Sequence, residues 1–350
     1  MNEFINLTTN QHFISQAEQR LNSCSENLNP STAKIHRFNI ESLDPPSVSI
    51  EKPALIARNL AFQELFTLAR IGNKERLNLE TFFGRYEGPF PEKASNLLKW
   101  IDRVKSKSST EQRKIDLSIL DDCDFSLILD DVKFIFKFKF MAGLRNPHQI
   151  KRTLANFSYA VNHCPNEIKA LELYSSLEKK NKSEEDYICK TYQVSPEEYR
   201  EWIRLLIFFL YVNEEDKTTL DGFIEEFFTA KELFTSIQVH SFDSECALLT
   251  DTGIVIDHDL TYFMNVSKNC IIALRHVDIA RDCDARDFSR ERKMAFVESC
   301  GGKLQGSLFI DDRDILSGYN KICVKTSFKK VFSASDEIVG VSIINRTAKN

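Results

Sequence analysis

The chain has 350 residues, of which 42% are apolar and 28% are charged, and its net charge at pH 7 is −5. This length predicts one large domain or two ordinary ones, and the composition excludes a chain that is disordered throughout. The mild negative charge excludes a surface built as a whole to bind nucleic acid, but it leaves room for a local basic groove.

The cysteines and the apolar stretches indicate the cellular compartment. The nine cysteines include no closely spaced pair, so neither a zinc site with paired ligands nor a disulfide framework is expected. The longest apolar stretch, residues 203–212, is too short to span a bilayer, and the N-terminus does not read as a secretory signal. We expect a cytoplasmic protein with reduced, buried thiols and no membrane partner.

The N-terminal half begins with a polar and irregular stretch up to about residue 50, with a short helix at 13–21 and a short strand at 35–40. Apolar residues recur at helical spacing over 54–69, which predicts a helix there. Further helices are predicted over 79–86 and 93–104, and Ser109 resembles the first residue of a capping box.

Residues 125–144 fit two periods. Phenylalanines alternate with other residues as in a strand, and several also share one helical face; the length of the run favours a helix. Helices are also predicted over 147–163, 165–182 and 220–236. The clearest helix start is Ser195-Pro196-Glu197-Glu198, in which serine caps the helix and proline occupies its first turn.

After residue 239 the pattern changes to short β-prone runs, at 247–249, 254–256, 271–274, 321–325 and 339–344. A charged stretch at 278–293 interrupts them and is predicted to be helical near its end. The fold class expected is therefore α+β, with a mainly helical body and a small, mostly C-terminal β-sheet. We expect an N-terminal segment at 1–50 packed on the body, the helical body at 51–238, and a β-rich part at 239–350 that is continuous with the body.

Three ionisable residues are candidates for catalysis. His12 follows Gln11 in a polar opening motif, and histidine transfers protons near neutral pH. Glu87 follows an aromatic helix face, and Asp251 occupies a turn after a β-prone run. Each has a structural alternative: a histidine bonded to a neighbouring loop, a solvated acid, and an ordinary turn aspartate.

Basic residues gather around Arg145-Asn146-Pro147, where Asn146 resembles a helix cap and Pro147 a first helical residue. His148, Lys151 and Arg152 follow. A helix start with such neighbours is a candidate site for phosphate, and we expect these residues and Gln11 to bind substrate. The alternative is that Arg145 pairs with Glu87 or Asp251 for structural reasons.

Taken in order, these motifs resemble a bacterial family of unknown function. Its members open with Asn/Gln-His-Phe/Tyr-Ile/Val-Pro, and continue with an acidic residue, an Arg-Asn/Thr-Pro motif and an aspartate before short strands. Here the matches are Gln11-His12-Phe13-Ile14, Glu87, Arg145-Asn146-Pro147 and Thr250-Asp251-Thr252-Gly253, over most of the chain to about residue 275. Ser15 departs from the family pattern, because a proline is usual there. The resemblance implies a link to mobile elements and anti-phage defence.

Two functions from different classes follow. In the first, the protein is an effector enzyme, nuclease-like or toxin-like, that acts on nucleic acid or nucleotides: His12 is the acid or base, Glu87 and Asp251 orient it or hold a divalent metal, and Arg145 binds phosphate. The sequence leaves open whether any metal is needed. In the second, the protein is a sensor or protein-binding module, and the same residues form a structural polar network. A protein partner or a homo-oligomer fits either function. Sequence motifs of the common nucleotide-binding and hydrolase classes, such as the P-loop, are missing.

Overall fold

The computed structural model describes residues 4–25, 29, 31–71, 74–107, 114–116, 125–161, 163, 165, 167–213, 216–257, 261–279, 281–282 and 289–344. Of these residues, 47% are helical and 28% are in strands, and the strands form four sheets. The sheets are spread along the whole chain. The prediction of a mainly helical body with a small, mostly C-terminal sheet is therefore wrong.

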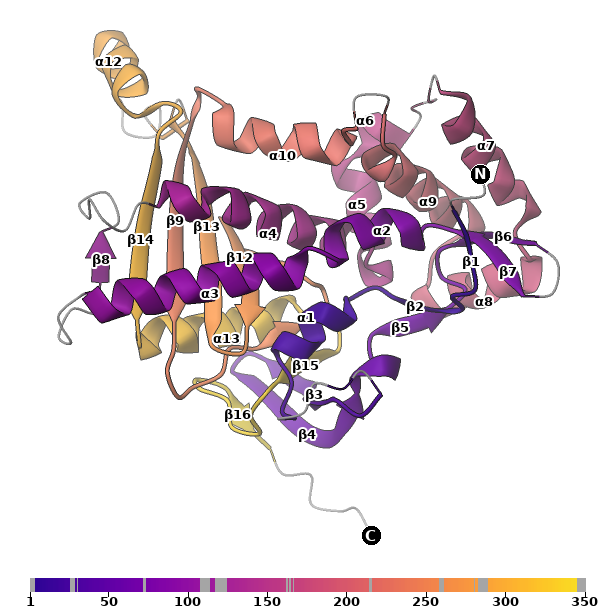
Figure 1. Cartoon of the computed structure of the whole chain (residues 1–350), viewed down its shortest axis with the longest axis horizontal. Helices are drawn as coiled ribbons and strands as arrows, with labels where there is room; N and C mark the ends of the chain where they lie inside the picture. Colours follow the sequence, from indigo (N-terminus) through magenta and orange to yellow (C-terminus); the bar gives the residue numbers. More distant parts are fainter. Residues whose placement is uncertain are drawn as a thin grey trace.

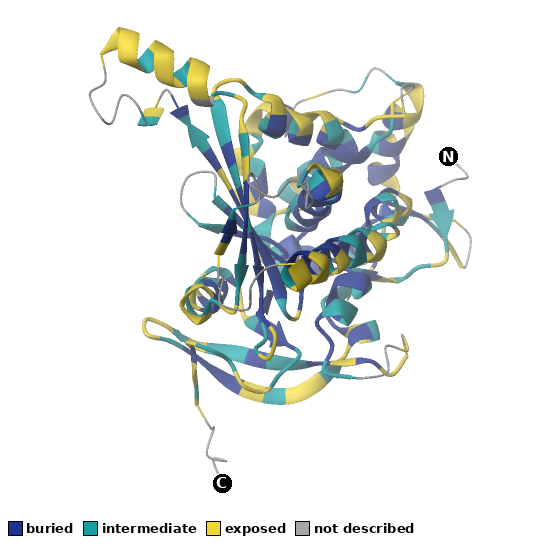
Figure 2. Ribbon diagram, turned by 60° about the vertical axis from the view of Figure 1, so that its left-hand side comes forward, coloured by how far each residue is buried: buried dark blue, intermediate teal, exposed yellow. Residues whose placement is uncertain are grey.

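A six-stranded sheet lies behind α3 and α4 in the left half of Figure 1, in the order β11-β12-β13-β9-β14-β8. Its strands are β8 (Lys114–Asp116), β9 (Leu233–Ser241), β11 (Val255–Asp257), β12 (Thr261–Ser267), β13 (Cys270–Asp278) and β14 (Leu304–Ile310). Strands β9 and β14 are parallel, and the other neighbours are antiparallel. Residues 270–274 are all buried, because helices cover both faces of this sheet. Figure 2 shows the buried strands edge-on, with several helices on one side and a single helix on the other.

A five-stranded sheet joins the two ends of the chain. Its order is β10-β15-β3-β4-β16, with β3 (Lys34–Leu43), β4 (Pro46–Leu55), β10 (Leu249–Thr250), β15 (Lys330–Ser333) and β16 (Ser342–Ile343). Helix α13 (Arg313–Thr326) packs its Tyr319 and Cys323 against Phe38 and Val331 of this sheet. The boundary expected at residue 50 falls within β4.

Two small sheets complete the strands: β1 (Ile5–Asn6), β7 (Glu75–Asn78) and β6 (Thr67–Ile71) form one, and β2 (Asn10–His12) and β5 (Ala61–Gln63) the other. The remaining helices are α1 (Gln16–Leu21), α2 (Glu80–Glu87), α3 (Phe90–Lys107), α4 (Ser126–Leu144), α5 (Ile150–Asn156), α6 (Ser158–Val161), α7 (Ile168–Ser176), α8 (Lys182–Tyr192), α9 (Pro196–Leu210), α10 (Thr219–Thr229) and α12 (Arg290–Cys300). Short 3-10 turns are η2 (Ile56–Arg58), η3 (Pro147–Gln149) and η4 (Leu177–Lys179).

Several local predictions are confirmed. Residues 126–144 form α4, which is buried on most of its surface and therefore satisfies a helical and an alternating period at once. Ser195 makes the expected capping box with Glu198, and Asn146 caps η3 with Pro147 in its first turn. Of the five cysteines whose state is described, Cys189, Cys270 and Cys323 are buried free thiols, as predicted, whereas Cys24 and Cys246 are free thiols that are only half-buried.

Other local predictions are wrong. The stretch 54–69 is not a helix; it contains η2, β5 and the start of β6. Leu60 and Glu64 have φ of 53° and 57°, a left-handed conformation that interrupts a regular helix. Residues 321–325 belong to α13 instead of a strand, and the predicted helix at 220–236 ends at Thr229. The predicted capping box at Ser109 lies outside the described residues. Among the described helices, none is long and apolar enough to cross a bilayer.

Candidate functional site

The opening motif forms strand β2, whose alternation separates Gln11 from His12. Gln11 is fully buried: its Nε2 donates to Thr67 Oγ1 at 3.0 Å, and its Oε1 accepts from the Phe66 N–H. His12 pairs with Ala61 of β5 and is only partly buried. Gln11, predicted to bind substrate, is therefore an interior anchor for the strand that carries His12.

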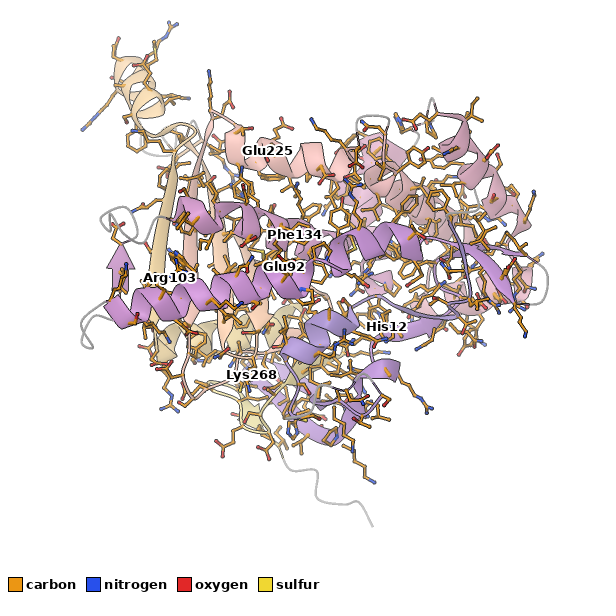
Figure 3. All side chains as sticks on the ribbon, in the orientation of Figure 1. His12, Glu92, Arg103, Phe134, Glu225 and Lys268 are labelled. Carbon is orange, nitrogen blue, oxygen red and sulfur yellow. The ribbon has the colours of Figure 1, made fainter. Side chains whose placement is uncertain are left out.

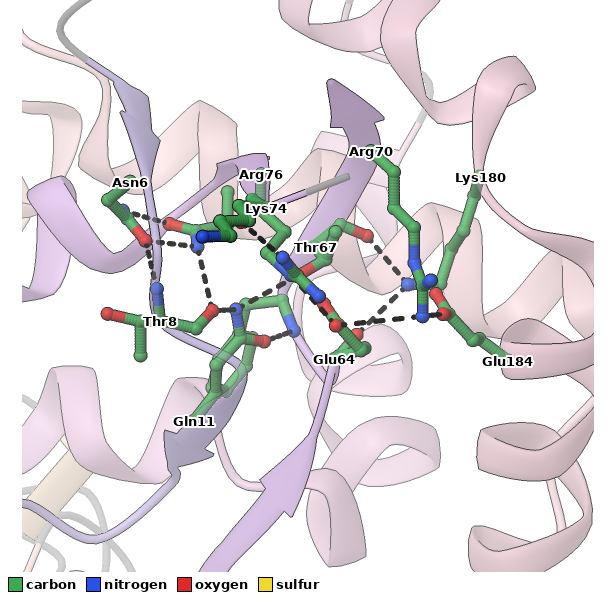
Figure 4. A network of polar contacts seen from close by, with 12 residues as sticks. Asn6, Thr8, Gln11, Glu64, Thr67, Arg70, Lys74, Arg76, Lys180 and Glu184 are labelled. Carbon is green, nitrogen blue, oxygen red and sulfur yellow. Dashed lines mark hydrogen bonds and ion pairs between the residues drawn. The ribbon is translucent and has the colours of Figure 1, made fainter. Parts of the chain in front are cut away.

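A polar network extends from Gln11 away from His12 (Figure 4). Thr67 Oγ1 donates to Glu64 Oε2 at 2.8 Å, and Arg76 Nε donates to Glu64 Oε1 at 2.9 Å. Lys180 Nζ donates to the backbone carbonyls of Glu64 and Thr67 at 3.0 and 2.6 Å. These bonds connect β2 and β6 with the segment before α8, which stabilises the position of the opening motif.

Ser15 begins helix α1 directly after the motif. Its φ of −55° lies in the range that proline adopts, so the backbone here would also accept a proline. Its hydroxyl also accepts a hydrogen bond from the Ala17 N–H at 3.1 Å, which proline cannot offer. Phe13 and Ile14 are buried and hold the motif on the body.

Arg145 lies at the end of α4 and is 1% exposed. Its Nη2 donates to Glu87 Oε1 at 2.5 Å, and its Nε donates to the Phe13 carbonyl at 3.1 Å. Its guanidinium lies 4.7 Å from the centre of the Phe83 ring. The pairing with Glu87 that was left open as an alternative is the one observed, and it leaves Arg145 buried between α2 and the residue after His12.

Asp251 makes a structural contact elsewhere. Its carboxylate accepts from the backbone N–H groups of Phe328, Lys329 and Lys330 at 2.7, 2.8 and 2.9 Å, and it is 3% exposed. Its own carbonyl accepts from Asn146 Nδ2 at 2.5 Å. The Asp251 carboxylate therefore holds the turn between α13 and β15. The Asp251 backbone carbonyl is the group that contacts the Arg145-Asn146-Pro147 motif, through Asn146.

The basic residues after Arg145 do not converge on His12. The His148 ring stacks on Phe328 at 4.1 Å and meets the edge of Phe13 at 5.9 Å, and burial lowers the pKa of His148 to about 4. Lys151 and Arg152 are exposed on α5. Arg152 lines a second pocket, described below.

His12 and Glu87 share an open pocket with a volume of about 460 Å³, between β2, α1 and α2. Figure 3 labels His12, which lies beside α1. The polar side chains that line it, in addition to these two, are Thr8, Asn10, Ser15, Gln16, Arg20 and Glu80. Arg145 and Asp251 are outside this set. Of the three predicted catalytic residues, His12 and Glu87 therefore line the same open pocket, and Asp251 does not.

One face of α2 supplies the acidic wall of the pocket. Glu80, Gly84 and Glu87 are spaced i, i+4 and i+7, so they lie on the same side of the helix. A Cβ added at Gly84 would meet nothing within 4 Å, so the missing side chain leaves space between the two carboxyl groups. The sequence thus builds a recess on α2 with an acid at either end.

The electrostatics of the two proton-transfer candidates differ. Burial raises the pKa of Glu80 to about 7, and its buried Oε1 has no hydrogen-bond partner in the described part of the chain. Burial lowers the pKa of His12 below 6.5, so the ring is neutral at pH 7. Its Nε2 lies 3.4 Å from the Ile56 carbonyl, which can only accept. The proton is therefore assigned to Nε2, and the lone pair to Nδ1.

The described residues contain no group of three or more His, Cys, Asp or Glu side chains arranged to hold a metal ion.

Sequence reasoning did not select Glu80 or Arg20. Glu80 carries a usable signal, since it lies seven residues before Glu87 on the same helix with a glycine between them. Arg20 lies one helical turn after Gln16, and its Nη1 is 3.4 Å from Gln16 Oε1. Glu18, next to the motif, is fully buried and pairs with Lys139 of α4, so it faces away from the pocket.

Comparison of the chain with protein-family models, with curated proteins and with solved structures finds no significant match. The resemblance to the bacterial family therefore stays a prediction.

Proposed function

We propose that the protein is an enzyme that acts on nucleotides or nucleic acid by general acid–base catalysis in the His12 pocket. The observation that carries this proposal is Glu80, a carboxyl group with a pKa of about 7 and an unbonded buried oxygen, in the same pocket as a neutral histidine. Burial raises the pKa of Glu80 and lowers that of His12, so that near pH 7 a partly protonated carboxyl group and a neutral histidine are present together.

The two groups have complementary roles in cleavage of a phosphoester. His12 Nδ1 accepts the proton of the attacking hydroxyl or water as its oxygen bonds to phosphorus. Glu80 gives its proton to the leaving oxygen as the old phosphorus–oxygen bond breaks. Arg20 supplies positive charge for the phosphate in place of Arg145, whose guanidinium is already bonded to Glu87 and Phe13.

A second candidate function is a sensor or binding module without catalysis. It is favoured by Gln11, Arg145 and Asp251, which are all buried and bonded within the protein. In this case the His12 pocket binds a polar ligand without cleaving it. The buried hydrogen bonds around the pocket then either transmit a conformational change on binding or keep the pocket rigid.

Turnover separates the two functions. Purified protein is incubated with RNA, single- and double-stranded DNA and nucleotides, and the products are resolved by chromatography. We expect cleavage by the wild type, and a loss of roughly 100-fold or more in both His12→Ala and Glu80→Gln, the usual effect of removing a general acid or base. Glu226→Gln, on the exposed side of α10, is the matched control and should keep full activity.

Binding without cleavage would favour the second function. If nucleotides bind to the wild type and to Glu80→Gln equally well and no substrate is cleaved, the catalytic proposal is wrong. Growth of bacteria that express the wild type or His12→Ala tests the toxin-like role in parallel: the wild type should slow growth, and the variant should not.

A further inference from the structure

A second pocket lies at the other side of the α4 end, and it shares no lining residue with the His12 pocket. Its volume is about 150 Å³, and its apolar lining comes from Phe140, Phe157, Phe223, Tyr262, Ile254 and Ile256. The three phenylalanine rings pack against one another with centroids 5.4 to 6.3 Å apart. The walls are therefore held by ring contacts, and the pocket is formed before any ligand binds.

One wall is polar and basic. Gln149, Arg152 and Asn156 are spaced i, i+3 and i+7 at the start of and along α5, so they lie on one helical face. Within the described chain, these three side chains make no hydrogen bond or ion pair, and the Tyr262 hydroxyl makes none either. Arg152 is exposed, and α5 contains no acidic residue to neutralise it.

The unpaired guanidinium beside an aromatic cavity defines the chemistry of a ligand. We propose that this pocket binds a small aromatic carboxylate, with the ring among Phe140, Phe157 and Phe223 and the carboxylate on Arg152. A cavity of about 150 Å³ has room for a single benzene-sized ring. The planar guanidinium matches a carboxylate with two parallel hydrogen bonds, and Gln149 and Asn156 offer further donors.

Phenylacetate tests this proposal directly. Binding of a fluorinated phenylacetate to the full chain is followed by fluorine NMR, and the affinity of unlabelled phenylacetate is measured by competition. We expect saturable binding, and phenylacetamide, which has the same ring but no charge, should bind at least about tenfold more weakly, the contribution of a charge-assisted hydrogen bond. Inorganic phosphate should not displace the ligand, because it cannot fill the apolar cavity.

Variants separate the charge from the cavity. Arg152→Gln should weaken phenylacetate binding at least about tenfold and leave phenylacetamide binding unchanged, whereas Lys151→Gln, the exposed basic neighbour outside the lining, should change neither. Ile256→Trp fills the cavity and should abolish binding of both probes, with an unchanged melting temperature as evidence of folding. The proposal is wrong if the amide binds as tightly as the acid, if Arg152→Gln behaves like Lys151→Gln, or if no saturable binding is seen.

Discussion

Replacing Glu80 with glutamine should raise the free energy of unfolding, and it should do so increasingly as the pH rises. The pKa of Glu80 is about 7 in the folded protein, against 4.5 for an ordinary glutamate. The difference of 2.5 pH units corresponds to about 3 kcal/mol, at roughly 1.4 kcal/mol for each unit. Burial of the charge is the cause, because the side chain has lost water and its Oε1 has gained no partner in the described chain.

The pH range follows from proton binding in the two states. Below pH 4.5 the carboxyl group is protonated in both the folded and the unfolded chain, so the variant gains little there. Between 4.5 and 7 the folded chain keeps the proton and the unfolded chain has lost it, so the wild type loses about 1.4 kcal/mol per pH unit relative to the variant. Above about pH 7 both states are ionised and the difference stays constant at about 3 kcal/mol.

The measurement is urea denaturation of wild type and Glu80→Gln between about pH 4 and pH 8.5. Glu226→Gln, on the exposed face of α10, is the control, and its difference from wild type should stay within about 0.5 kcal/mol at every pH. A gain for Glu80→Gln that does not grow with pH would refute the reasoning, because it would arise from packing or a new hydrogen bond. A loss at high pH would show that the carboxylate has a partner and that its pKa is not raised.

The other predictions concern the buried contacts of Arg145 and Asp251 and the pH dependence of the cleavage rate. Arg145→Met should lower the free energy of unfolding by about 3 kcal/mol, measured in urea, because Glu87 loses its charged partner; an unchanged value would contradict the structural role. Asp251→Ala should lower it by about 3 kcal/mol, since three backbone N–H groups lose their acceptor; a thermal melt at neutral pH checks this. The cleavage rate should rise with pH below 6.5 as His12 loses its proton and fall above about pH 7 as Glu80 does; a rate that keeps rising to pH 9 would exclude Glu80 as the acid.

Long segments with strong local signals were predictable from the sequence. The capping box at Ser195 and the apolar run of α4 depend on neighbours within a few residues. Strand β3 was predicted only in part, as a short strand at 35–40, whereas it extends over Lys34–Leu43. Its pairing with β4 shifts register near Ile35 and again near Ile40, which breaks the alternation of buried and exposed residues. Its other partner, β15, lies about 300 residues later, so no local pattern announces it.

The candidate site likewise depends partly on local sequence signals and partly on long-range packing. The sequence motifs pointed to His12 and Glu87, and both residues line the same pocket. Glu80 was missed because a glutamate in the first turn of a helix usually complements the helix dipole and is solvated. Its raised pKa comes from burial, and burial depends on how α1 and β2 pack beside α2, which no local sequence window contains.

Arg145 connects the residues that line the pocket with the residues that are buried in the structural network, two groups that the sequence could not separate. It is bonded on one side to the Phe13 carbonyl, next to His12, and on the other to Glu87. These two bonds fix the distance between strand β2 and helix α2, and therefore the width of the pocket that His12 and Glu80 both line. An arginine is suited to this because its planar guanidinium donates in several directions from one rigid group. A residue that touches no substrate thus sets the geometry in which the proposed chemistry operates.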